Sequence, residues 1–301
     1  MVNRVLRAAT RQSPLALWQA EHVRGLLQAA HPGLTVELVP MQSEGDVRLD
    51  VPISAIGGKG VFAKEVQQAV LAERADFAVH SAKDLPAVTV DGLCLAAVPE
   101  RGDPHDALVG ATLDALPHGA TVASGSQRRR AQLARLRPDL VFTELRGNMA
   151  SRLSKVPDGG AIVVAVAAFQ RLGLEEHLAQ VLTVDQMVPQ VGQGALGIEC
   201  REGDVATRDL LAAIEHRTTR RRVDAERAFL AELGGDCDLP AGAHARVAGV
   251  QDEGILVLDA FLATDGTHQA TVVSHRATGD DPEALGHAVA RHLRQALGPQ
   301  T

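Results

Sequence analysis

The chain of 301 residues is poor in aromatic side chains, with one tryptophan, six phenylalanines and no tyrosine. Proteins that bind single-stranded nucleic acid stack bases on aromatic side chains, and nucleic-acid binders in general neutralise phosphates with a basic surface. Because this chain has few aromatics and a formal net charge of −7, we expect it to bind no nucleic acid.

Cysteine is also scarce, and Cys94, Cys200 and Cys237 lie far apart with no CxxC pair. This spacing argues against a disulfide-stapled scaffold and against a structural zinc site. No run of 18 apolar residues occurs, so we expect no membrane-spanning segment. The first residues contain no apolar segment typical of a signal peptide. We therefore expect a reducing compartment, most simply the cytoplasm.

Lysine supplies only four of the 30 basic residues, so arginine carries most of the positive charge. The planar guanidinium of arginine matches carboxylates and phosphates. On a net-acidic chain, basic groups gathered near strand ends predict a local positive cleft between two similar α/β lobes, suited to a polyanionic small molecule. Nine basic residues sit in predicted strand-end or loop positions: Arg7, Arg11, Lys59, Lys83, Arg128, Arg129, Arg146, Arg152 and Arg171.

The length predicts two or three domains, and two of them repeat one pattern. A predicted strand over residues 5–9 is followed by a helix over 15–30, with Ser13 in the N-cap position. A second unit repeats this order, with a strand over 121–123 and a helix over 127–136. Arg128 and Arg129 lie in the first turn of this second helix, where cations oppose the helix dipole. That arrangement indicates a bound anion.

One short apolar strand runs directly into a polar cluster. Residues 77–79 predict a buried strand that ends near His80, and Lys83 and Asp84 follow at once. Pro86 is expected to prevent a helix from forming within the cluster. Ligands of open α/β sheets bind beyond the carboxyl ends of strands. Asp84, a carboxylate among cations, is therefore the predicted general acid or base.

The last third of the chain predicts a separate arrangement of strands. Residues 192–197 match the GxGxxG pattern but lack the preceding strand and following helix that a dinucleotide site needs. We interpret them as a crossover that returns the chain from the second unit to the first. Strands over 243–250, 255–263 and 268–274 then predict a three-stranded antiparallel sheet, and a helix over 282–297 packs on it.

Cys237 lies on a glycine-flanked loop between Asp236 and Asp238. Adjacent carboxylates raise the pKa of a thiol, which argues against a nucleophile of the thiol-protease kind. From the residues alone, the thiol is a nucleophile, a buried apolar group or an attachment point. His80 beside Ser81 is interpreted as a structural histidine, because neighbours in sequence do not form a catalytic triad.

Four longer stretches together resemble the porphobilinogen deaminase (hydroxymethylbilane synthase) family. They stand in the family's order at residues 10–20, 79–86, 145–148 and 191–201, and the resemblance covers nearly the whole chain. It implies an α/β fold with two similar lobes like those of periplasmic binding proteins, plus a smaller α+β third domain with a three-stranded antiparallel sheet. The expected domains are residues 1–99 with 195–216, residues 100–194, and residues 217–301.

The resemblance also implies a transferase of tetrapyrrole (haem-type) biosynthesis. Four molecules of porphobilinogen, each with two carboxylates, are condensed stepwise with loss of ammonia on a dipyrromethane cofactor. Hydrolysis then releases hydroxymethylbilane. The cofactor is bound through a thioether to Cys237. We expect no nucleic-acid or membrane partner and a monomeric protein.

By the same resemblance, Asp84 assists proton transfer and deamination. The residues expected to hold the cofactor are Ser13, Lys83, Asp84, Ser126, Arg128, Arg129, Arg146 and Cys237. The residues expected to bind substrate are Arg7, Arg11, Lys59, Arg152 and Arg171, and no metal is expected. The chain departs from the family pattern where Ala55 replaces a lysine, His105 an arginine and Asp236 a glycine.

Two functions from other classes fit parts of the sequence. A binding protein for a polyanion shares the two lobes and the arginines but needs neither Asp84 nor Cys237. Alanine at Asp84 leaves ligand affinity intact and abolishes turnover only if the protein is an enzyme. A thiol-dependent hydrolase needs a Cys237 with a low pKa, which the rate of iodoacetamide alkylation against pH tests.

Overall fold

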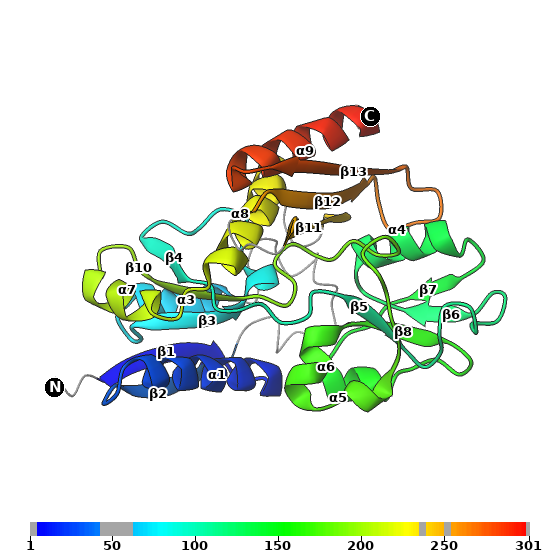
Figure 1. The fold of residues 1–301 in the computed structure, drawn as a ribbon. Helices are drawn as coiled ribbons and strands as arrows, with labels where there is room; N and C mark the ends of the chain where they lie inside the picture. The colour runs from blue at the N-terminus through cyan, green and yellow to red at the C-terminus, as the bar shows by residue number, and fades with distance from the viewer. Residues whose placement is uncertain (1–4, 43–62, 235–238, 250–253, 299–301) are drawn as a thin grey trace. The chain divides into compact units, whose positions relative to one another are not determined.

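The computed structural model describes residues 5–42, 63–234, 239–249 and 254–298 (Figure 1). The chain divides into two units, Met1–Gly102 with Ala195–Arg220, and Asp103–Gly194 with Arg221–Thr301. Their described residues form two five-stranded sheets and one three-stranded sheet. This confirms the predicted fold class of two similar α/β lobes with an additional antiparallel sheet. The three predicted domain boundaries stay a prediction.

The first unit contains a five-stranded mixed sheet. Its strands are β1 (Val5–Arg11), β2 (Thr35–Met41), β3 (Phe77–Ser81), β4 (Leu93–Ala97) and β10 (Leu196–Arg201). They lie in the order β2-β1-β3-β10-β4. β1 is parallel to β2 and β3, whereas β10 is antiparallel to β3 and β4. Since β10 returns the chain to this sheet after the second lobe, the predicted crossover is confirmed.

Among the described residues, this unit contains the helices α1 (Pro14–Ala30), α3 (Lys64–Leu71) and α7 (Val205–Ala212) and the 3-10 helix η2 (Ala82–Asp84). The Ser13 side chain accepts a hydrogen bond from the Ala16 backbone N at 3.3 Å, which confirms the predicted N-cap. The expectation that Pro86 prevents a helix in the polar cluster is wrong. A proline restricts the residue directly before it, and the single 3-10 turn ends at Asp84, one residue earlier.

The second lobe repeats the strand pattern of the first. Its strands are β5 (Asp106–Val109), β6 (Thr121–Ala123), β7 (Val141–Thr143), β8 (Ala161–Ala165) and β9 (Leu178–Val181). Their order is β7-β6-β8-β5-β9. β6 is parallel to β7 and β8, and β5 is antiparallel to β8 and β9. The predicted repeat is therefore confirmed, although the sequence patterns did not predict β5 or β9.

Four helical segments accompany this sheet: α4 (Gln127–Leu136), α5 (Met149–Leu153), α6 (Val166–Leu172) and the 3-10 helix η3 (Glu175–His177). The bounds of α4 match the prediction. Leu108 and Val122 of the sheet and Leu133 of α4 are fully buried in one apolar cluster. This packing fixes α4 on the sheet, with the first turn of the helix directly beyond β6.

The remaining part of the second unit carries the three-stranded antiparallel sheet and α9 (Pro282–Leu297). The helix α8 (Arg217–Glu232) begins in the first unit and continues into the second. The strands of the sheet are β11 (Ala241–Val247), β12 (Leu256–Ala263) and β13 (Val272–Gly279), and α9 lies along this sheet in Figure 1. β13 begins four residues after the predicted start, because the ladder with β12 opens only at the pair Ala263 and Val272. In the described part of the chain, no helix is long and apolar enough to cross a membrane.

Candidate active site

The carboxyl ends of β1 and β3 form one edge of the first sheet, because these strands are parallel neighbours. Arg11 is the last residue of β1, and Asp84 ends the 3-10 turn that follows β3. Arg11 Nη1 lies 3.8 Å from Asp84 Oδ2, with the two side chains 21% and 27% exposed. The partly buried Lys83 precedes Asp84 in the same turn. The structure thus places the guanidinium of Arg11 beside the carboxylate of Asp84, as the sequence predicted for a carboxylate among cations.

The N-terminus of α1 lies at the same edge, immediately after β1. The backbone N of Gln12 donates to Met41 O at 2.9 Å, which holds this turn against the end of β2. The buried Gln19 donates from Nε2 to Ser81 Oγ at 2.8 Å and so connects α1 to the end of β3. Sequence reasoning missed Gln19. Its signal is a polar residue on the buried face of α1, beside Ala16 and Ala20.

A buried polar pair supports this edge from within the sheet. His80 Nε2 lies 3.2 Å from Glu199 Oε2, and both side chains are almost fully buried. Gln67 on α3 donates from Nε2 to Glu199 Oε2 at 2.8 Å. Buried carboxylates require such partners. The pair agrees with the structural interpretation of His80, and Glu199 on β10 is its partner that sequence reasoning missed.

Arg7 does not join the edge that carries Asp84. Its backbone N, Nε and Nη2 donate to the carboxylate of Asp76 at 2.7, 3.2 and 3.0 Å. Asp76 directly precedes β3, so this pair lies at the amino end of that strand. The hydrogen bond to Asp76 raises the pKa of Arg7. Burial would raise the pKa of Asp76, but the hydrogen bonds from Arg7 outweigh it and lower that pKa. The expected substrate contact of Arg7 gains no support from this position.

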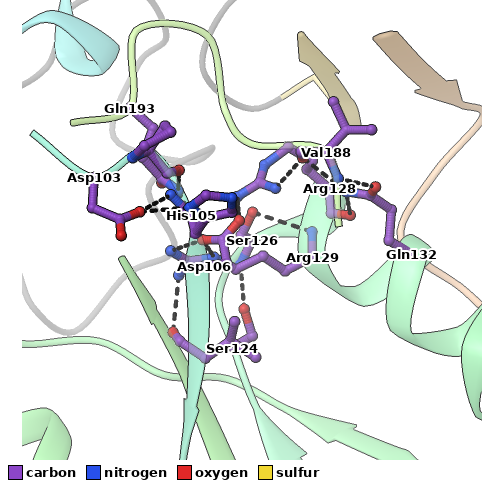
Figure 2. A network of polar contacts seen from close by, with 12 residues as sticks. Asp103, His105, Asp106, Ser124, Ser126, Arg128, Arg129, Gln132, Val188 and Gln193 are labelled. Atoms are coloured by element: carbon purple, nitrogen blue, oxygen red, sulfur yellow. Dashed lines mark hydrogen bonds and ion pairs between the residues drawn. The ribbon is translucent and has the colours of Figure 1, made fainter. Parts of the chain in front are cut away.

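In the second lobe, a buried carboxylate holds two of the predicted arginines (Figure 2). Arg128 Nη2 lies 2.8 Å from Asp106 Oδ2, and Arg129 Nη2 lies 2.7 Å from Asp106 Oδ1. Asp106 is the first residue of β5 and pairs with Ala165, the last residue of β8. An antiparallel strand therefore starts with a carboxylate at the edge where the parallel strands end. The helix-dipole argument from sequence predicted a bound anion here, and that argument was incomplete, because Asp106 supplies an internal one.

The charges of this cluster are set by burial and pairing together. Burial would raise the pKa of the Asp106 carboxyl, but the guanidinium groups of Arg128 and Arg129 outweigh it and lower the pKa to about 2. Burial conversely lowers the pKa of Arg128. Gln193 Nε2 donates to Asp106 Oδ1 at 3.1 Å and to Pro104 O at 2.7 Å. Sequence reasoning missed Asp106 and Gln193, although both lie in stretches that it examined.

The remaining predicted residues of the second lobe lie near the same strand ends. Ser126 caps α4 by accepting from the Arg129 backbone N at 3.5 Å. Arg146 follows β7, and Arg152 in α5 donates from Nε to Gly147 O at 2.8 Å. Arg171 near the end of α6 donates to the Gly194 carbonyl at 2.6 Å, and burial lowers its pKa to about 10.

A histidine contact flanks this cluster (Figure 2). His105 Nδ1 lies 2.7 Å from Asp103 Oδ1. The hydrogen bond from His105 lowers the pKa of Asp103, against the opposing effect of burial. His105 thus pairs with a carboxylate at the position where the family pattern has an arginine.

Two buried nitrogens of the predicted cofactor-holding arginines lack acceptors among the described residues. They are Arg146 Nη1 and Arg128 Nε. Leaving a buried donor unpaired costs about 1–3 kcal/mol, so these atoms fit a bound group that brings its own carboxylate oxygens. Lys59 and Cys237, with Ala55 and Asp236, lie outside the described residues. In the part of the chain that the structure describes, no group of three or more His, Cys, Asp or Glu side chains could hold a metal.

Several solved structures are similar to this chain at low sequence identity. One similar solved structure is YhfZ from Shigella flexneri, with 17% identity, a TM-score of 0.40, and 77% of this chain and 98% of that chain covered. Another is a TRAP periplasmic solute binding protein from Desulfovibrio salexigens, with 12% identity, a TM-score of 0.44, and 71% and 73% covered. A third is the methionine binding protein MetQ, with 13% identity, a TM-score of 0.44, and 70% of this chain and 90% of that chain covered. Nothing about a ligand follows from identities this low.

Two family models match the sequence in chain order. Residues 6–209 match the dipyrromethane cofactor binding domain of porphobilinogen deaminase, and residues 220–295 match its C-terminal domain. These matches establish hydroxymethylbilane synthase activity in tetrapyrrole biosynthesis, with a dipyrromethane cofactor and porphobilinogen as substrate. They decide against a polyanion-binding protein and a thiol-dependent hydrolase. The chain belongs to the porphobilinogen deaminase family.

Proposed function

We propose that Asp84 is the catalytic acid–base residue of the hydroxymethylbilane synthase reaction. The observation that carries this proposal is the 3.8 Å contact between Asp84 Oδ2 and Arg11 Nη1 at the carboxyl ends of parallel strands. A carboxylate fixed there can accept a proton from the pyrrole N–H of porphobilinogen. It also stabilises the positive charge that develops in the substrate ring as ammonia departs.

The cofactor is anchored, in this proposal, by a thioether to Cys237. When bound, the dipyrromethane supplies the ring carbon to which substrate rings are added. In the first unit, its carboxylates are held by Ser13 and Lys83, and Asp84 binds its pyrrole nitrogens. In the second unit, the carboxylates are held by Ser126, Arg128, Arg129 and Arg146. The acceptorless nitrogens of Arg128 and Arg146 support this assignment.

Substrate carboxylates are bound by the remaining basic groups. Arg11 ends β1, whereas Arg152 lies in α5, the helix that follows β7, and Arg171 lies near the end of α6, the helix that follows β8. Lys59 is assigned by its place in the sequence alone. Arg7 is the weakest member of the set, because its guanidinium is engaged by Asp76. The proposal further includes a monomeric, cytoplasmic protein with the three domain boundaries given above.

Intact-protein mass spectrometry under denaturing conditions tests the anchor. We expect the wild type to exceed its sequence mass by two linked pyrrole units, and Cys237→Ser to lose that excess. Cys94→Ser is the matched control and should keep it. Incubation with porphobilinogen should add further species spaced by one pyrrole unit. A wild type at its bare sequence mass after incubation with substrate contradicts the proposed anchor.

A further inference from the structure

Two cysteine side chains of the first unit face each other across neighbouring strands. Cys94 on β4 and Cys200 on β10 are directly opposite in the antiparallel ladder. Their Sγ atoms are 3.8 Å apart, in thiol–thiol contact, and both cysteines are free. Neither residue belongs to the catalytic or binding groups assigned above, so the pair needs its own explanation.

The backbone around the pair suits a disulfide. Two residues further along the ladder, the Glu202 backbone N donates to Gly92 O at 2.9 Å. Antiparallel ladders alternate with a period of two residues, so Cys94 and Cys200 form a hydrogen-bonded pair, for which the Cα atoms are about 5.5 Å apart. Disulfides span Cα separations of about 4.4–6.8 Å. The Sγ atoms must approach from 3.8 Å to about 2.05 Å, so we expect closure to combine side-chain rotation with a small shift of β4, which lies at the edge of the sheet.

We propose that Cys94 and Cys200 form a dithiol site that reacts with a small organic disulfide, such as oxidised glutathione, and closes reversibly to an intramolecular disulfide. The Cys94 thiolate attacks one sulfur of the reagent, forming a mixed disulfide and expelling one thiolate. Cys200 then attacks the Cys94 sulfur, expels the second thiolate and loses its proton to it. Two protein thiols are oxidised, and one organic disulfide is reduced to two thiols.

The order of these steps follows from exposure. Cys94 is partly exposed on β4, which is an edge strand of the sheet, whereas Cys200 is fully buried. Burial, the adjacent Cys94 sulfur and Asp204 together raise the pKa of Cys200 to about 12, against the opposing effect of Arg208. The nucleophile in thiol–disulfide exchange is the thiolate. Cys94 is therefore the attacking thiol, and Cys200 is the resolving one.

The site lies away from the proposed catalytic edge of the same sheet. Cys200 pairs with Phe77, the first residue of β3, whereas Asp84 follows the last residue of that strand. Closing the disulfide links two positions 106 residues apart and restricts the unfolded chain. We expect the oxidised protein to unfold at a higher temperature than the reduced protein, with its activity retained.

Peptide mapping of the full-length holoprotein tests the proposal. The reduced protein is incubated with oxidised glutathione, quenched in acid, alkylated with N-ethylmaleimide and digested with trypsin. Cys94, Cys200 and Cys237 fall on separate tryptic peptides, ending at Arg101, Arg201 and Arg246. We expect a linked Cys94–Cys200 pair that dithiothreitol separates. Because each cysteine has its own peptide, the result does not depend on the proposed role of Cys237.

Two variants distinguish the roles of the thiols. In Cys200→Ala, we expect Cys94 to retain one glutathione as a stable mixed disulfide. In Cys94→Ala, we expect Cys200 to stay unmodified, because it is buried. The proposal is overturned if native wild type gives no linked pair while Cys200→Ala accepts glutathione, or if the linked pair forms only after the protein is unfolded in urea.

Discussion

At the residue scale, Asp106 decides the state of two arginines at the start of α4. Replacing one partner of a buried ion pair leaves an uncompensated charge and costs about 3–5 kcal/mol. We therefore expect Asp106→Asn to lower the free energy of unfolding by that amount in urea titrations. Glu144→Gln is the matched control, because exposed Glu144 pairs with Arg130 of the same helix. Exposed pairs contribute about 0–1 kcal/mol, so equal losses in both variants would contradict this role of Asp106.

The same carboxyl group predicts an acid-sensitive contribution to stability. Its pKa is about 2 in the folded protein, below the ordinary value of about 3.9. A depressed pKa stabilises the fold above the unfolded pKa, and this stabilisation is lost as pH falls from about 4 towards 2. The contribution is about 2 kcal/mol, reduced by the cost of burying Arg128. In urea unfolding from pH 6 to pH 2, wild type should lose more stability than Asp106→Asn. Equal losses of unfolding free energy in the two proteins would contradict this contribution of Asp106.

Asp84 gives a prediction about turnover. We expect Asp84→Asn to keep the fold and to lower kcat for porphobilinogen consumption by about 10²–10⁴-fold, the range that a positioned acid–base group contributes. Asp91→Asn is the control, because Asp91 is an exposed carboxylate in the connection between Asp84 and β4. Circular dichroism checks that both variants fold. A kcat of Asp84→Asn within twofold of wild type would show that Asp84 is not the catalytic acid–base residue.

At the scale of elements, Gly286 allows α9 to approach α8. A Cβ atom at Gly286 would lie 2.3 Å from Ala225 O and 2.7 Å from Phe229 N, both backbone atoms of α8. We expect Gly286→Ala to destabilise the protein by at least about 1–3 kcal/mol, because overpacking forces backbone shifts. Gly25→Ala in α1 has no atom within 4 Å of the new Cβ and should stabilise by about 0.5–1 kcal/mol. Thermal unfolding compares them, and opposite signs are the expected result.

Also at the scale of elements, some helices and strands can be predicted from the sequence and others cannot. The bounds of α4 and α9 follow from caps and period, which are local signals. β5 and β9 have only four residues each, and β5 begins with a carboxylate that is buried only because Arg128 and Arg129 meet it. Such a strand has no local signature. It is visible only once its ladder partner β8 is known.

At the scale of the whole molecule, a net charge of −7 coexists with the basic residues proposed to bind substrate carboxylates. We expect KM for porphobilinogen to rise several-fold between 0.1 M and 1 M KCl, because the Debye length falls from about 10 Å to about 3 Å. The value of kcat should change little, because salt weakens the binding of substrate carboxylates and not the chemical step. Steady-state kinetics measure both, with sucrose as a control for solute effects. A KM that is independent of salt would contradict electrostatic capture.

The sequence by itself determined the family, the two-lobed α/β fold class and the local framework of the site. Ser13, Asp84 and the first turn of α4 were predictable because caps, strand ends and helix starts depend on residues close together in the chain. Only the tertiary structure decided which side chains pair. Gln19 and Ser81 are 62 residues apart, and Gln193 and Asp106 are 87. The tertiary structure also placed Arg7 at the amino end of β3 and Cys94 opposite Cys200. These contacts depend on sheet order and register, which arise when distant segments pack together and which no local pattern records.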